Sequence, residues 1–160
     1  MKHLPLLLVL ILTSCGHKAI MITDGSPQKA VVQYYEAARN GDFERARSYL
    51  SSYDHKKFEK YPENRTVGIE YVKKHSITPR IHCVQTKGRF SAVAIVYKDP
   101  RSQKGDDRME YVLVASENDE WKLVMTSRPY IDPADWKISA EEKQNIRALE
   151  TWYEERRKRF

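Results

Sequence analysis

The chain has 160 residues, of which 41% are hydrophobic and 31% are charged, and its formal net charge is +6 at pH 7. This length suits one domain with a sizeable core and is short for two. Because acidic residues are interleaved with the basic ones along most of the chain, the positive charge does not indicate nucleic-acid binding.

The N-terminal residues have the pattern of a bacterial secretory signal. A weakly cationic start precedes an apolar run over residues 4–12, which is too short for the ~20 residues that span a bilayer. The run closes on Leu12-Thr13-Ser14-Cys15, which resembles the lipobox of bacterial lipoproteins. The resemblance implies cleavage between Ser14 and Cys15, loss of residues 1–14 as a signal peptide, and a lipid on the Cys15 sulfur.

This lipid would place the protein in the bacterial cell envelope. One acyl chain binds a membrane only marginally at ~0.8 kcal/mol per buried CH₂, whereas the two or three chains of a lipoprotein, palmitate among them, would anchor it permanently. Residues 15–25 would form the lipidated tether. Gly16 after the cysteine favours the outer membrane if the organism is Gram-negative. The alternative is an ordinary secretory peptide cleaved near Ser14, without a lipid.

Two helices are predicted directly after the tether. Ser26 offers a capping hydroxyl and Pro27 suits the first helical position, and apolar residues recur at helical spacing up to residue 40. Asp42 is a suitable cap for a second helix over residues 43–50.

Residues 54–76 allow two interpretations in their second half. Residues 54–61 predict a helix that Pro62 interrupts. Beyond it, Val67, Tyr71 and His75 have helical spacing, but the apolar residues at 67, 69 and 71 also alternate as in a strand, and Gly68 weakens a helix. We take residues 66–75 as a helix.

After Pro79 the sequence becomes rich in β-branched and aromatic residues separated by turn residues, which predicts an antiparallel meander. Met109, Tyr111 and Leu113 alternate with other residues, so we expect an apolar sheet face that the N-terminal helices cover. The four predicted strands are Arg80–Thr86, Phe90–Lys98, Arg108–Ser116 and Trp121–Arg128.

The last part of the chain, residues 129–160, predicts an extension with one amphipathic helix. Ser139 and Glu142 have the spacing of a capping box. The apolar stripe of the helix would pack on the domain or on a second copy, which would make a homodimer. This stripe consists of Ile146, Leu149, Trp152 and Tyr153.

The order of helices before an antiparallel sheet, with two local motifs, resembles the nuclear transport factor 2-like superfamily, whose fold is cystatin-like α+β. The first motif lies in residues 26–52 and contains Val31-Val32-Gln33-Tyr34-Tyr35-Glu36-Ala37-Ala38 and Asn40-Gly41-Asp42-Phe43; the second is Asn118-Asp119-Glu120-Trp121-Lys122-Leu123-Val124. Small envelope lipoproteins of this superfamily look similar. The resemblance implies a cone-shaped domain over residues 26–128, and it leaves the activity open.

Enzymes of this superfamily use a carboxylate or histidine inside the cone to abstract a proton, with a tyrosine hydroxyl to stabilise the oxyanion. Asp54 and His55 resemble the Asp and His positions of dehydratase-like members, His82 lies in a strand, and Glu110 lies on the strand face opposite Tyr111. Nothing in the sequence joins any of them to a partner, so we predict no catalytic residue.

The sequence also predicts no metal site and no cofactor. The histidines at positions 17, 55, 75 and 82 lack the short spacings that place two imidazoles on one face. Cys83 has no second thiol for a disulfide once Cys15 carries a lipid, and it suits a small hydrophobic position in a strand.

Aromatic residues of the first helix and the strands could line a ligand pocket in the cone, although core packing explains the same spacing. We therefore expect a membrane-anchored module that binds a small hydrophobic ligand or an envelope protein without catalysis. The alternatives are an isomerase-like or dehydratase-like enzyme on a small hydrophobic substrate, and an interaction module that docks through its C-terminal helix. The candidate pocket residues are Tyr34, Tyr35, Tyr97, Tyr111 and Trp121.

Overall fold

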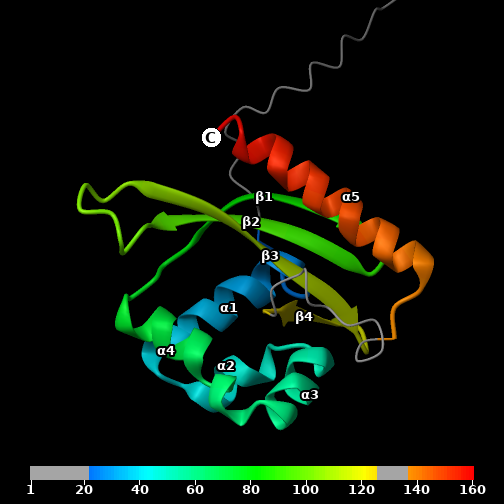
Figure 1. The fold of residues 1–160 in the computed structure, drawn as a ribbon, viewed down its shortest axis with the longest axis horizontal. Helices are drawn as coiled ribbons and strands as arrows, with labels where there is room; N and C mark the ends of the chain where they lie inside the picture. Colours follow the sequence, from blue (N-terminus) through cyan, green and yellow to red (C-terminus); the bar gives the residue numbers. More distant parts are fainter. Residues whose placement is uncertain (1–21, 126–136) are drawn as a thin grey trace, which may run out of the picture.

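The computed structural model describes residues 22–125 and 137–160. The predicted signal peptide, Cys15 and most of the tether lie outside the described residues, as does the segment 126–136. Helices come first in the chain, then a sheet, then a last helix (Figure 1). The helices before the sheet are α1 (Pro27–Asn40), α2 (Phe43–Ser48), α3 (Ser52–Lys60), the 3₁₀ turn η1 (Pro62–Asn64) and α4 (Val67–Lys74).

The predicted start and end of α1 are confirmed by its caps. The Ser26 hydroxyl accepts a hydrogen bond from the Lys29 N–H at 3.3 Å, and Gly41 ends the helix in the left-handed conformation at φ 74°. Val31, Tyr34 and Ala38 on one side of α1 are buried. This helix is therefore the central element against which the sheet packs.

The helical interpretation of residues 66–75 is confirmed by α4. Ile69 and Val72 are the residues that α4 buries, at 2% and 4% exposure. Val67 and Tyr71 are 55% and 39% exposed. The apolar residues of this segment thus lie on more than one side of the helix, and only packing decides which side is covered.

The sheet has four antiparallel strands in the order β1-β2-β3-β4. The predicted last strand is seen as β4 up to Val124, and its residues 126–128 lie outside the described residues. The strands are β1 (Arg80–Lys87), β2 (Phe90–Lys98), β3 (Asp107–Glu117) and β4 (Glu120–Val124). Together with the helices they make the predicted α+β fold.

The two faces of the sheet have different covers (Figure 1). The inner face lies toward α1 and carries Val93, Ile95 and Val112. The outer face lies toward the last helix, α5 (Ala140–Arg157), and carries Phe90 and Leu113. The expectation that the N-terminal helices cover Met109, Tyr111 and Leu113 was therefore wrong. Both faces of β3 are apolar, so alternation along this strand does not show which face meets which helices.

The last helix is an integral layer of the described structure. Its predicted capping box is confirmed, because the Ser139 hydroxyl accepts from the Glu142 N–H and the Glu142 carboxylate accepts from the Ser139 N–H. Leu149 is fully buried against the outer face. The Tyr153 hydroxyl also donates to the Met109 carbonyl at 2.9 Å. These contacts place α5 on the domain itself.

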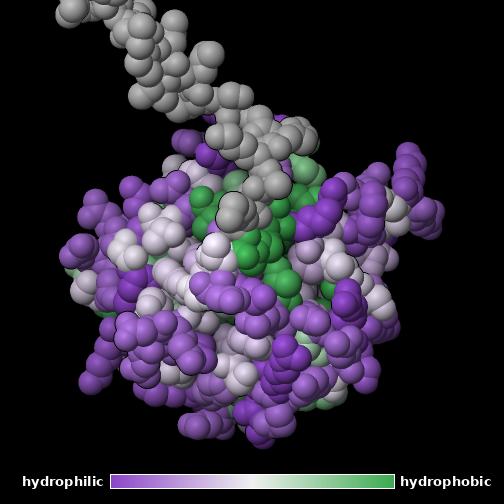
Figure 2. All heavy atoms as spheres, turned by 180° about the vertical axis from the view of Figure 1, so that it is seen from behind, coloured by the Kyte–Doolittle hydropathy of each residue, from purple (hydrophilic) through white to green (hydrophobic). Residues whose placement is uncertain are grey.

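The surface is mainly hydrophilic. Figure 2 shows one face of the molecule, on which the largest hydrophobic area lies in the upper part. None of the described helices combines the length and the hydropathy needed to cross a membrane. Among the described residues, the large hydrophobic side chains that are exposed are Ile22, Tyr61, Val67, Tyr71 and Phe160.

Candidate functional site

A cavity of about 320 Å³ lies between α1, α3, α4 and the end of β4. Its base is polar, its walls are apolar and its mouth is basic. The base consists of Tyr34 and Asp54, the walls of Leu50, Phe58, Val67, Gly68, Ile69 and Met125, and the mouth of Lys57, Asn64 and Arg65. This volume is at the lower end of the ~300–1,000 Å³ that small-molecule sites occupy.

Asp54 is fully buried at the base of the cavity. Its carboxylate oxygen Oδ2 accepts a hydrogen bond from the Ser51 hydroxyl at 2.6 Å and from the Met125 N–H at 3.1 Å. Ser51 is also the N-cap of α3, because its hydroxyl accepts from the Asp54 N–H at 3.2 Å. Asp54 thereby fixes the first turn of α3 to the end of β4, and its charge is met by protein donors.

The chain just before α3 explains why these two elements meet. Leu50 forms a parallel bridge with Leu123 of β4. The Ser51 N–H donates to the Leu123 carbonyl at 2.8 Å, and the Leu123 N–H donates to the Tyr49 carbonyl at 2.7 Å. These bonds add a short stretch of chain to the edge of β4 that does not pair with β3. They bring Asp54 beneath the inner face of the sheet.

Tyr34 supplies the second polar group of the base. Its side chain is 1% exposed, and its hydroxyl has no hydrogen-bond partner among the described residues. Burial raises the pKa of Tyr34, and the nearby Asp54 carboxylate raises it further, so the hydroxyl stays protonated. A hydroxyl that lines a cavity without a protein partner is a donor available to a ligand.

The mouth of the cavity carries positive charge. Lys57 is half-buried and Arg65 is exposed, and neither has an ion-pair partner within the described part of the chain. Val67 of the apolar walls is 55% exposed, so the walls reach the surface. A ligand would therefore pass two cations and an apolar rim before it reached Tyr34.

The five aromatic residues predicted for a pocket do not share one site. Tyr34 lines the cavity. Tyr35 packs beside Tyr34, with ring centroids 5.4 Å apart, and is buried in the inner core with Tyr97. Trp121 lies on the same sheet face but lines a separate hollow of about 450 Å³ at the start of α1. Tyr111 lies on the outer face against Tyr153.

The residues considered for catalysis are also dispersed. Of these, only Asp54 lines the cavity; His55 does not, and His82 lies on β1 near Phe160, with ring centroids 5.9 Å apart. Glu110 lies on the inner side of β3, near the Tyr97 hydroxyl, and pairs with Arg108. Burial and the adjacent Glu110 carboxylate raise the pKa of Tyr97.

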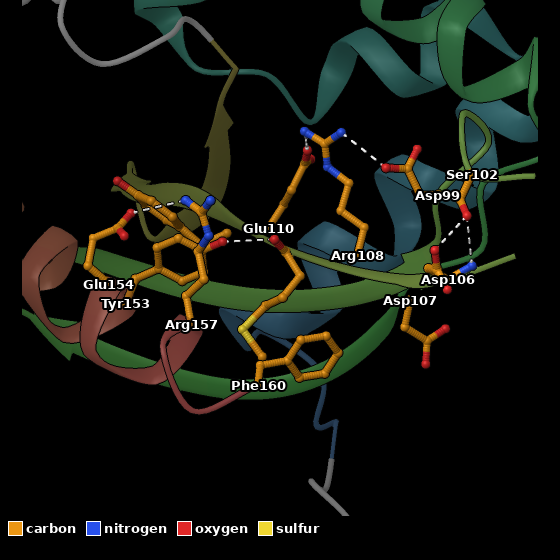
Figure 3. A pocket seen from close by; sticks show the side chains of 12 residues that line it. Asp99, Ser102, Asp106, Asp107, Arg108, Glu110, Tyr153, Glu154, Arg157 and Phe160 are labelled. Carbon is orange, nitrogen blue, oxygen red and sulfur yellow. Dashed lines mark hydrogen bonds and ion pairs between the residues drawn. The ribbon is translucent and has the colours of Figure 1, made fainter. Parts of the chain in front are cut away.

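A larger hollow of about 830 Å³ lies between the loop after β2, the start of β3 and the end of α5 (Figure 3). Its polar groups largely pair with one another. Arg108 bridges Asp99 at 3.5 Å and Glu110 at 2.5 Å, and Arg157 pairs with Glu154 at 3.7 Å. Because these charges are already matched and the lining is strongly polar, we favour the smaller cavity as the ligand site.

Sequence reasoning missed Lys57, Arg65 and Gly68 as lining residues. They come from α3, the turn before α4 and α4 itself, and only the tertiary arrangement brings them to one cavity. Among residues 22–125 and 137–160, no cluster of histidine, cysteine, aspartate or glutamate side chains is arranged to hold a metal ion. Cys83 lies half-buried on β1.

No family model matches the sequence, and no curated protein matches it. Among solved structures, the chain is similar to a Campylobacter jejuni protein described as an NTF2-like transpeptidase, with a TM-score of 0.50 and 10% identity. The match covers 63% of this chain and 99% of the other. At this identity the likeness concerns the fold alone. The chain therefore has an NTF2-like α+β fold, to which α5 adds a C-terminal helix.

Proposed function

We propose that this protein is a bacterial envelope lipoprotein, anchored through Cys15, whose NTF2-like domain binds a small molecule in the cavity between α1, α3 and α4 without catalysis. The observation that carries the proposal is the cavity of about 320 Å³, which combines apolar walls with the Tyr34 hydroxyl, a donor that no hydrogen bond to a described residue occupies. A hydroxyl in this position can donate a hydrogen bond to a ligand that enters the cavity.

A neutral fluorescent probe tests ligand binding. N-phenyl-1-naphthylamine is apolar and gains fluorescence when it leaves water, so it should bind the apolar walls of the cavity. We expect saturable binding by a soluble form that begins at Ser26. Gly68→Leu should abolish it, because the added side chain competes for the space of the cavity, while Gly68→Ala should retain it. Absence of saturable binding, or equal binding by Gly68→Leu, would refute the cavity as a site.

The lipid anchor is tested separately in a bacterial host. The chain should incorporate labelled palmitate and partition with membranes, and Cys15→Ser should lose both properties. Mass spectrometry of the purified chain should show an acylated residue 15 as its first residue. Retention of residues 1–14, or an unmodified thiol at Cys15, would refute the anchor and leave the cavity proposal intact.

An isomerase-like or dehydratase-like enzyme is the second candidate, because Asp54 and Tyr34 line one cavity. In such an enzyme Asp54 would abstract a proton and Tyr34 would stabilise the oxyanion. The Ser51 and Met125 donors on Oδ2 give Asp54 a structural role instead. Exchange of a bound ketone's α-protons with deuterated water, abolished by Asp54→Asn, would support the enzyme. Binding without exchange supports the non-catalytic module.

A partner that docks through the C-terminal helix is the third candidate. The apolar stripe of α5 is already used within the domain, since Ile146, Leu149 and Tyr153 are buried. A partner would have to bind the polar side of the helix. Removal of residues 139–160 should therefore unfold the domain; a folded truncated domain that loses an envelope partner would support docking.

A further inference from the structure

The charges around the cavity indicate which class of small molecule it accepts, an inference that rests on the proposed binding function. Lys57 and Arg65 stand at the mouth without ion-pair partners in the described chain. The only acidic lining residue is Asp54, which is fully buried and receives hydrogen bonds from Ser51 and Met125. The cavity thus presents uncompensated positive charge at its entrance and a compensated carboxylate at its base.

The walls between these two ends are apolar. Leu50, Phe58 and Met125 offer no hydrogen bond from their side chains, so this part of the cavity favours a hydrocarbon body. At ~30 Å³ for each water-sized group, a volume of about 320 Å³ holds about ten such groups. This is the size of a chain of about eight carbons with a small polar head.

We propose that the cavity binds a small amphipathic carboxylic acid, with its carboxylate between Lys57 and Arg65 and its apolar body along the walls. The inner end of the ligand meets the Tyr34 hydroxyl and Asp54. An uncharged oxygen suits this position, since it can accept from Tyr34, whereas a second carboxylate would be repelled by Asp54. The ligand is therefore a monocarboxylate, and a hydroxyl or oxo group at its far end improves the fit.

Three probes with the same eight-carbon body test the charge preference: octanoate, octan-1-ol and octylammonium. Each is used to displace N-phenyl-1-naphthylamine from the soluble form. Octanoate should displace the dye at a concentration about five- to tenfold lower than octan-1-ol, because each cation near the surface contributes roughly two- to fivefold. Octylammonium should be the weakest. The advantage of octanoate should shrink at high salt.

Matched variants assign this advantage to the two cations. Lys57→Gln and Arg65→Gln should each lower octanoate affinity about two- to fivefold and leave octan-1-ol unchanged. Lys56→Gln is the control, because it removes the same charge from an exposed residue of α3 that does not line the cavity. Circular dichroism of each variant checks that the fold is retained.

The outcomes separate this inference from the proposed function. If the dye binds and octan-1-ol or octylammonium displaces it as well as octanoate does, the carboxylic-acid class is wrong and the binding site stands. The same conclusion follows if Lys56→Gln lowers the affinity for octanoate as much as Lys57→Gln and Arg65→Gln do. If the wild-type protein does not bind the dye, both proposals fail.

Discussion

Gly68 is the position at which the shape of the cavity and the stability of the fold can be tested together. It lies in the first turn of α4, where glycine costs up to ~1 kcal/mol relative to alanine because its backbone is more flexible in the unfolded chain. A Cβ added to Gly68 would meet only the Tyr34 hydroxyl oxygen, at 3.7 Å, which is an ordinary contact. Gly68→Ala should therefore raise the free energy of unfolding by about 0.5–1 kcal/mol.

Urea unfolding followed by circular dichroism measures this effect. The midpoint should rise with no change in the slope m, and the melting temperature should rise by about 1–4 °C for a domain of this size. Gly68→Leu also replaces the flexible glycine backbone and so gains the same stability, which should keep the variant folded while its side chain blocks the cavity. A lower stability for Gly68→Ala would mean that the space beside Gly68 is not open and would refute the cavity's geometry.

Three further predictions follow from particular contacts. Leu149→Ala removes a fully buried side chain between α5 and the outer sheet face and should lower the free energy of unfolding by about 2–5 kcal/mol in urea titrations; no change would show that α5 is not part of the core. Burial alone would raise the pKa of Glu142, but hydrogen bonds from Arg89 and the Ser139 N–H outweigh it and lower the pKa. The stabilisation from the Arg89–Glu142 pair is therefore fully present above the unfolded pKa of ~4.3, and it is lost as the pH falls through the lower pKa of the folded state. Glu142→Gln should therefore make the free energy of unfolding less sensitive to acid. An unchanged pH profile of the free energy of unfolding would contradict this. Tyr34→Phe should change the free energy of unfolding by less than about 1 kcal/mol, because the hydroxyl has no described partner, and should remove any advantage of 8-hydroxyoctanoate over octanoate in dye displacement; a retained advantage would place the hydroxyl of the ligand elsewhere.

Local signals made the order of the elements predictable. Ser26, Gly41 and the Ser139–Glu142 pair mark the ends of helices through hydrogen bonds that involve only near neighbours in the chain. Similarly, runs of β-branched residues marked the strands, and turn residues marked the breaks between them. Such features depend little on the tertiary structure, which is why the NTF2-like arrangement could be predicted.

It was less predictable which side of a helix or strand is buried, and against which element. The alternation of Met109, Tyr111 and Leu113 is real, but Val112 on the opposite side of β3 is also buried. The sequence therefore did not show that α5 would cover one face and α1 the other. In α4, similarly, the buried residues are Ile69 and Val72, although Val67 and Tyr71 have equally regular spacing.

The cavity could be predicted only in part. Tyr34 and Asp54 were both considered from the sequence, but their proximity depends on the bridge between Leu50 and Leu123, which joins residues far apart in the chain. Lys57 and Arg65 are separated by a turn and look like ordinary surface cations. Their position at one mouth depends on η1, which contacts both α3 and α4.

The most direct test of the account is to map the binding site by NMR. Amide signals of the isotope-labelled soluble form should be recorded while octanoate is added. The account predicts that the largest shifts occur at Gly68, Ile69 and Met125, with smaller changes around the larger hollow at Asp106 and Phe160. Shifts concentrated at Asp106 and Phe160, with none at Gly68 or Met125, would contradict it.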